Sequence, residues 1–127
     1  MRSRPETPSS PPVKSVKAKV RAQRELELTG VMNYPNPFSE VTNFYYHLSQ
    51  DADRVEIKIF TLAGKLIKRI PFASSRRGVN FSATWDGRDE EGDKVATGVY
   101  IYKIVAEGSV NGERKVKETF GKAVVVR

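Results

Sequence analysis

Hydrophobic and polar residues alternate with a period of two along several segments of the chain. In residues 42–48, one face collects Thr42, Phe44, Tyr46 and Leu48. In residues 55–59, the apolar side chains Val55, Ile57 and Ile59 alternate with charged ones, and in residues 80–85 the alternating set is Phe81, Ala83 and Trp85. This period is typical of a strand with one buried and one solvated face. The pattern therefore predicts three half-buried strands, with Trp85 in the core.

The region after residue 25 divides into about seven strands separated by turn residues. The predicted strands are 26–33, 41–48, 54–62, 65–70, 79–85, 98–107 and 114–126. Gly64 and the pair Asn111-Gly112 fall between strands, where a hairpin turn needs positive φ. Val99 to Val105 is apolar on both faces except at Lys103, which indicates a central strand, and the last strand is expected to bend at Gly121. Residues 26–127 are therefore predicted to form an all-β, antiparallel two-sheet sandwich.

Positive charge is concentrated at the N-terminus. The chain has 127 residues and a net charge of +7, and residues 1–24 contain seven Lys or Arg against one Glu. This stretch is rich in Pro and Ser and has no aromatic residue, so it cannot offset an ordering entropy of about 1–2 kcal/mol per residue. We predict that residues 1–25 form a disordered basic linker. The alternative is a cationic arm for nucleic acid or lipid. The rest of the chain is nearly neutral, so we expect no nucleic-acid partner.

Few residues suit catalysis or metal binding. The chain has no cysteine and a single histidine, His47, on which any His-based metal site or catalytic triad would have to depend. Five carboxylates lie within residues 86–93, but their spacing does not match a twelve-residue calcium loop, and turn formation by Asp and Gly explains them better. We expect no catalytic residue, no metal, no cofactor and no enzyme activity. No apolar run approaches the roughly 18 residues that span a bilayer, so no membrane-spanning segment is expected.

Two motifs go beyond composition. In Tyr34-Pro35-Asn36-Pro37-Phe38 the prolines fix φ and remove two backbone donors, which predicts a stiff crossover that does not pair as a central strand. The second motif runs from Trp85 to Tyr100: a core tryptophan ends a strand, an acidic turn follows, and a glycine opens a buried aromatic strand. Its structural positions are Trp85, Asp86, Gly87, Asp89, Gly92, Gly98 and Tyr100.

The order of these motifs resembles the immunoglobulin-like domain of the flagellar hook-capping protein group. It is equally similar to the related C-terminal sorting domain of proteins exported by the type IX secretion system. The similar positions run from about residue 28 to the last residue: the Tyr34–Phe38 motif, strands 42–48 and 55–60, Gly64, Trp85-Asp-Gly-Arg-Asp89, Gly92 and Gly98-Val-Tyr100. The resemblance implies an immunoglobulin-like fold for residues 26–127, and it implies function by analogy.

Under this resemblance the domain is a non-catalytic sorting and cell-surface attachment signal of a larger protein exported by a Gram-negative bacterium, from periplasm to surface or medium. Its implied partners are the outer-membrane translocon, a surface sortase and upstream domains of the same precursor. Two alternatives stay open. One is a structural assembly module like the hook-capping domain. The other is a carbohydrate-binding accessory module of a secreted hydrolase, in which Tyr45 stacks on sugar.

The last strand is the candidate recognition segment. A sorting signal needs an exposed edge or end, and strand addition gives affinity through main-chain hydrogen bonds. We predict recognition through Lys122, Val124, Val126 and Arg127, helped by the crossover residues Tyr34, Pro35, Asn36, Pro37 and Phe38. The alternative is that the two valines fill the core while the two cations are solvated, because edge strands often carry cations that block aggregation.

Overall fold

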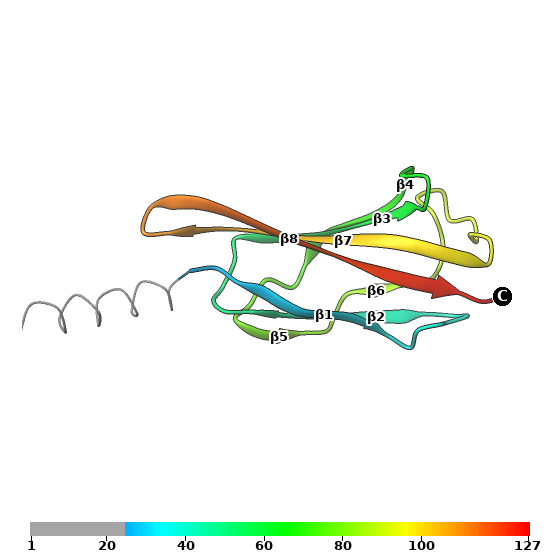
Figure 1. Ribbon diagram of the computed structural model, residues 1–127, viewed down its shortest axis with the longest axis horizontal. Coiled ribbons are helices and arrows are strands. Elements are labelled where there is room, and N and C mark those ends of the chain that lie inside the picture. Colours follow the sequence, from blue (N-terminus) through cyan, green and yellow to red (C-terminus); the bar gives the residue numbers. More distant parts are fainter. Residues whose placement is uncertain (1–24) are drawn as a thin grey trace, which may run out of the picture.

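The structure, a computed structural model, describes residues 25–127. The predicted linker 1–25 lies outside the described residues except for its last position. The described chain forms two stacked antiparallel sheets and contains no helix (Figure 1). This confirms the all-β, two-sheet prediction.

The first sheet is built around β2. It contains β1 (Leu28–Tyr34), β2 (Thr42–Leu48), β5 (Gly78–Asn80) and β6 (Thr84–Trp85), and β2 pairs with each of the others. The second sheet has the order β4-β3-β7-β8, with β3 (Arg54–Thr61), β4 (Leu66–Ala73), β7 (Gly98–Val110) and β8 (Glu113–Val125). The predicted central strand, β7, does lie between two neighbours, and β8 is an edge strand.

The longest element is the β7–β8 hairpin, whose tip (orange in Figure 1) extends beyond the other strands. The two strands pair in register from Gly98↔Val125 to Val110↔Glu113. Their turn has φ of 53° at Asn111 and 79° at Gly112. Positive φ at both central residues is the requirement of a type I′ turn, so the Asn-Gly signal is confirmed. Pairing continues past Gly121 without a register shift.

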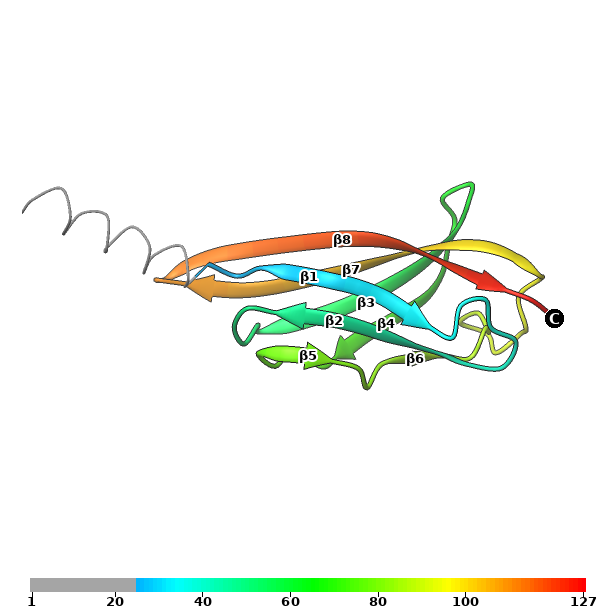
Figure 2. The same cartoon turned by 60° about the horizontal axis from the view of Figure 1, so that its bottom comes forward.

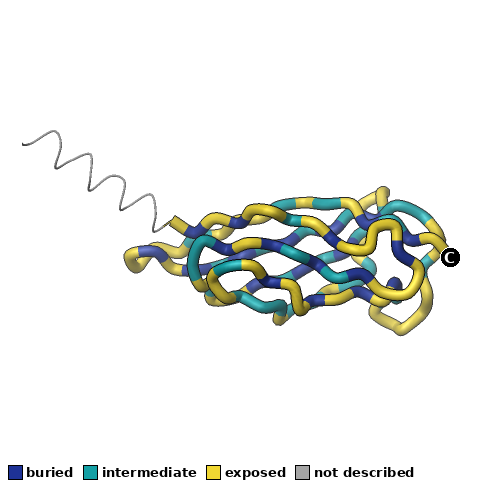
Figure 3. The backbone as a smooth tube through the Cα atoms, turned by 90° about the horizontal axis from the view of Figure 1, so that it is seen from below, coloured by how far each residue is buried: buried dark blue, intermediate teal, exposed yellow. Residues whose placement is uncertain are grey.

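The core lies between the sheets and is lined by alternate residues of each long strand (Figure 3). The predicted inward sets of β2 and β3 are all buried, together with Trp85, Tyr100 and Tyr102. The aromatic side chains meet edge to edge or edge to face, with ring centroids 4.8 Å apart for Phe44 and Tyr102. Such pairs add about 0.5–1.5 kcal/mol beyond burial.

The prediction that Phe81 points inward is wrong, because its side chain is 60% exposed. The predicted strand 79–85 is divided into β5 and β6. Tyr46 pairs with Asn80, whereas Asn43 pairs with Thr84, so one extra residue has entered between the two pairings. A one-residue shift exchanges the faces of a strand. Phe81 is therefore turned outward, while Trp85 stays inward.

The residue that replaces Phe81 inside is Asn80, which is buried. Its amide is fully engaged: Oδ1 accepts from Ser74 Oγ at 2.5 Å and from Arg76 N at 3.2 Å, and Nδ2 donates to the carbonyls of Arg76 and Gly78 at 2.8 and 3.1 Å. A buried amide without partners would cost about 1–3 kcal/mol. Asn80 instead fixes the loop between β4 and β5.

Two buried tyrosines give the fold a pH dependence. Burial raises the pKa of Tyr46 and of Tyr102 from 10.0 to about 12. Below pH 10 both phenols are neutral in the folded and unfolded states. Between pH 10 and 12 the unfolded chain loses protons that the folded chain retains, so stability falls as pH rises. A shift of this size corresponds to about 2 kcal/mol per tyrosine at pH 12.

The expected result is a declining free energy of unfolding between pH 10 and 12, measured by denaturant titration at each pH. Tyr102→Phe removes one ionising group from the core, so its decline should be shallower by about half of the tyrosine contribution. Parallel pH profiles for the two proteins would contradict this account.

Candidate functional site

The crossover after β1 lies against the end of β8, and together they form what we call the C-terminal corner: Tyr34–Phe38 and Lys122–Arg127. Phe38 N donates to Val124 O at 2.9 Å, and Val126 N donates to Phe38 O at 2.9 Å. Phe38 thus makes a parallel bridge with Val125. The expectation of a non-pairing crossover is wrong at Phe38, whose own donor is available because the prolines precede it. Both X-Pro bonds of the motif, before Pro35 and before Pro37, are cis.

Asn36 fastens the crossover to β8 like an additional peptide unit. Its Nδ2 donates to Lys122 O at 3.0 Å, and its Oδ1 accepts from Val124 N at 2.9 Å. The Asn36 amide therefore uses both its donor and its acceptor on the same edge of β8. A side-chain amide has the same donor and acceptor pair as a backbone peptide. Asn36 continues the main-chain pairing that Phe38 makes two residues later.

Sequence reasoning placed Thr42 on the inward face of its strand, but it missed the burial of Asn33 and the hydrogen bond between the two. Asn36 Nδ2 also donates to Asn33 Oδ1 at 3.1 Å, Asn33 Nδ2 donates to Thr42 Oγ1 at 3.1 Å, and Thr42 Oγ1 donates to Pro35 O at 2.7 Å. Asn33 and Thr42 are buried. This network ties β1, β2 and the crossover together. The available signal was Asn33 itself, an amide directly before a double-proline motif.

Arg127 joins two loops, the one between β1 and β2 and the one between β6 and β7. Its Nε donates to Val95 O at 3.0 Å, Nη1 to Ser39 O at 3.1 Å and Nη2 to Gly87 O at 2.6 Å. Its main-chain N donates to Thr97 Oγ1 at 2.9 Å. Gly87 has φ +72°, and a Cβ there would lie 2.9 Å from Nη2. The glycine of the Trp-Asp-Gly motif thus leaves room for the guanidinium. Arg127 is engaged by carbonyls and is not simply solvated.

The inward residues of β8 are Ala123 and Val125, which are fully buried. The interpretation in which Val124 and Val126 fill the core is wrong. Three consecutive valines are apolar on both faces of a strand, so the sequence does not indicate which of them points inward. Lys122 and Val126 are exposed. Lys122 O, both main-chain groups of Val124, and Val126 N already bond Asn36 or Phe38. Residues 122–126 therefore do not offer an open strand edge for main-chain pairing. Recognition through the side chains of these residues stays a prediction.

The Trp85 motif forms the neighbouring loop. Trp85 packs edge to face on Phe38 at 5.5 Å and on Tyr100 at 5.6 Å, and its Nε1 donates to Arg88 O at 2.9 Å. Asp89 Oδ1 accepts from the N–H groups of Glu91 and Asp93 at 3.0 and 2.9 Å. Asp89 therefore serves as a turn acceptor, as predicted.

The rest of the motif supports this loop. Gly92 has φ +87°, Asp86 Oδ1 accepts from Arg88 N at 3.2 Å, and Gly98 begins β7. Oxygens of Asp89, Glu91 and Asp93 lie within 4.8 Å of one another on the exposed side of the loop. The hydrogen bonds within the turn account for this clustering.

The outer face of the first sheet presents aromatic side chains. Tyr45 stacks on Phe81 with ring centroids 6.3 Å apart and an angle of 17° between the planes. His47 is exposed on this face and lies opposite Val79. Tyr45 therefore has a stacking partner within the chain.

Within residues 25–127 no helix has the length and apolar character needed to cross a membrane.

Comparisons with known proteins place this geometry in a family. The model of the FlgD Ig-like domain matches residues 37–109. Among solved structures, dimeric latent PorU from Porphyromonas gingivalis is 25% identical with a TM-score of 0.58, over 76% of this chain and 9% of that chain. CopC from Methylosinus trichosporium OB3b is 15% identical with a TM-score of 0.49, over 80% of this chain and 93% of that chain.

FlgD from P. aeruginosa is 20% identical with a TM-score of 0.43, over 80% of this chain and 64% of that chain. No curated protein gives a significant match. The chain corresponds to only a small part of PorU. The family match covers more than half of the chain, from Pro37 in the corner to Ser109 in β7, and it supports a non-catalytic module. The chain therefore belongs to the FlgD Ig-like domain family.

Proposed function

We propose that this domain is a sorting and surface-attachment signal of a larger protein exported through type IX secretion. The observation that supports this most is the similarity to PorU, which covers 76% of this chain but 9% of that chain, with a TM-score of 0.58. A domain of this shape therefore occurs as a small part of a much larger protein. The motif order from Tyr34 to Tyr100, which resembles type IX sorting domains, supports the same proposal.

The C-terminal corner is the part of the domain suited to recognition. Asn36, Phe38 and Arg127 hold the end of the chain through hydrogen bonds to β8 and to two loops. Side chains of Tyr34, Lys122 and Val126 remain exposed on this support. A surface that is already ordered does not have to be ordered on binding, which favours affinity. The proposed partners are the outer-membrane translocon and its sortase, with delivery from periplasm to surface.

The test fuses the full chain to the C-terminus of a reporter with an N-terminal export signal, in a Gram-negative bacterium that has a type IX translocon. The expected result is reporter at the surface or in the medium. Truncating the last strand is a poor variant, because it removes the buried residues Ala123 and Val125. The sharper variant is Lys122→Glu with Val126→Asp, which changes exposed side chains and should retain most of the reporter in the periplasm.

The matched control is Phe72→Ser in β4, since that side chain is 85% exposed and lies outside the corner. It should be exported like the unmodified fusion. Circular dichroism of each purified chain checks that the fold persists. Equal delivery in a strain without the translocon, or periplasmic retention of the unmodified fusion in the strain that has it, would sink the proposal.

A further inference from the structure

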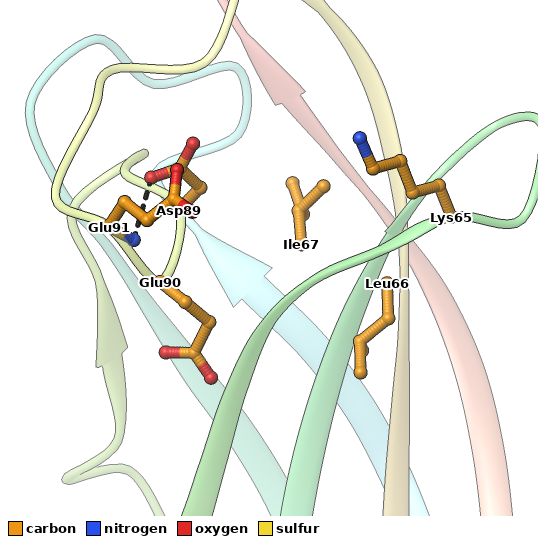
Figure 4. Close-up of a pocket in the computed structure, with 6 residues that line it drawn as sticks. All are labelled: Lys65, Leu66, Ile67, Asp89, Glu90 and Glu91. Atoms are coloured by element: carbon orange, nitrogen blue, oxygen red, sulfur yellow. Dashed lines mark hydrogen bonds between the residues drawn. The ribbon is translucent and has the colours of Figure 1, made fainter.

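Most sheet edges of the described chain are obstructed. At the β4 edge, Glu90 N donates to Ile67 O at 3.0 Å and Arg69 N donates to Glu90 Oε2 at 3.2 Å. Figure 4 shows the Glu90 loop beside Ile67 of β4. Pro71, further along β4, has no N–H to offer. These are common means of protecting an edge from pairing with another chain.

The first sheet has no long, regular edge either. The β1–β2 register shifts between Thr29 and Met32, where Gly30 has φ +62°. The opposite side of this sheet consists of β5 and β6, which have three and two residues. Neither side offers the uninterrupted row of main-chain groups that an added strand needs.

The edge of β8 differs along its length. Near the C-terminus, four of its outward main-chain groups are bonded by Asn36 or Phe38: Lys122 O, Val124 N, Val124 O and Val126 N. The β7–β8 register is unbroken, so the main-chain N–H and C=O groups of Arg114, Val116, Glu118 and Phe120 also point away from β7. No described residue bonds the outward main-chain groups of these four. Figure 2 shows β8 along one side of the sandwich, with β1 of the other sheet running next to it.

The side chains beside this edge have different chemistry on its two faces. On the outer face of the sheet, Val116 is 50% and Phe120 is 59% exposed. Phe120 also borders a shallow apolar depression with Leu62 and Ile101. The opposite face of β8 has Lys115, which forms an exposed ion pair with Glu113 at 3.2 Å, and Lys117. Lys117 is exposed and has no carboxylate within ion-pair distance among residues 25–127.

We propose that the β8 edge from Arg114 to Phe120, which we call the open edge, binds an extended peptide strand whose apolar residues alternate with acidic ones. Main-chain hydrogen bonds to the four outward residues would provide affinity. Apolar side chains of the added strand lie beside Val116 and Phe120, and carboxylates lie beside Lys115 and Lys117. This inference goes beyond the proposed function, because it assigns a peptide-binding site independent of export.

A second copy of the chain is a poorer occupant of the open edge. In an antiparallel pairing of two β8 strands centred on Lys117, the two Lys117 side chains face each other and each Lys115 approaches the partner's lysines. Like charges placed directly opposite one another are destabilising. An acidic, apolar strand avoids this repulsion and places opposite charges across the pair. The charge of the edge thus selects a peptide partner over self-association.

The test measures fluorescence anisotropy of labelled peptides with the full chain at low and high salt. One peptide alternates Val with Glu, a second alternates Val with Lys, and a third has the composition of the first in scrambled order. Only the Val/Glu peptide should bind, and added salt should weaken it. Lys117→Glu should weaken this binding about threefold to tenfold, in line with one or two surface charge pairs. Lys94→Glu, the same charge change in a distant exposed loop, should have no effect.

A second variant tests the main-chain bonds. Val116→Pro removes an outward N–H without taking a donor from the β7–β8 pairing, and it should lower binding of the Val/Glu peptide at least tenfold. Hydrogen exchange gives a direct readout, since the amides of residues 114, 116, 118 and 120 should gain protection with the peptide. If the variant does not fold, Lys117→Glu and the exchange pattern still decide the result. Equal binding of all three peptides, or binding without this protection, overturns the proposal.

Discussion

Trp85→Ala is expected to lower the free energy of unfolding by about 3–5 kcal/mol, the usual cost of truncating a large buried aromatic residue. Trp85 is 1% exposed and lies between Phe38 and Tyr100, with ring centroids 5.5 and 5.6 Å away. The truncation leaves a cavity between these rings and removes the donor to Arg88 O. A loss of this size approaches the whole stability of many small domains.

The measurement is urea unfolding followed by circular dichroism, because the variant has no tryptophan left as a fluorescent probe. Trp85→Phe should cost less, since it keeps an aromatic ring and loses mainly volume and the Nε1–H donor. Phe81→Ala is the matched surface control, and it should cost under about 1 kcal/mol because most of that ring is exposed. If Trp85→Ala costs no more than Phe81→Ala, Trp85 is not the anchor of this end of the core.

The Trp85 prediction also connects stability to the proposed sorting function. Phe38 packs on Trp85 and exchanges two main-chain bonds with β8. Loosening the ring of Phe38 therefore loosens the crossover that holds the chain end. A Trp85→Ala fusion is thus expected to lose export together with stability. For this reason exposed corner residues, and not core residues, are the informative variants for recognition.

The alternating segments were predictable because each strand must bury one face. The inward positions of β2 and β3 follow from sequence alone, and so does the Asn111-Gly112 turn, whose positive φ values few other residue pairs adopt. These features depend on local chemistry. These features can therefore be predicted from one sequence.

Features that depend on distant partners were not predictable. The extra residue before Thr84 reverses the face of Phe81, and only the pairing with β2 reveals it. The three valines of β8 suit either face, so their orientation is decided by the register with β7. Asn36 appears in the sequence as a residue between two prolines, but its role requires β8 to lie beside it. The sequence therefore singles out the residues of the corner, but it does not show the bonds that join them.

Gly121 shows the same dependence on a distant partner, and it gives the second large prediction. A Cβ at this position would lie 2.8 Å from Tyr102 Cε1 and still closer to the end of the ring. Tyr102 is buried and packs on Phe44, so the ring has little room to move. Gly121→Ala is expected to destabilise the domain by about 1–3 kcal/mol through overpacking, and Gly121→Val by more.

Two comparisons isolate this contact. Gly98→Ala, in the same hairpin, adds a Cβ that meets nothing within 4 Å, so it should be close to neutral. Gly121→Ala combined with Tyr102→Leu should cost less than the sum of the two single changes, because the shortened side chain leaves space for the methyl group. Denaturant unfolding of Gly98→Ala and of the four proteins of the Gly121/Tyr102 cycle gives both results. Additive costs would mean that Gly121 is needed for backbone bending, as the sequence suggested, and not for the close approach of Tyr102 to β8.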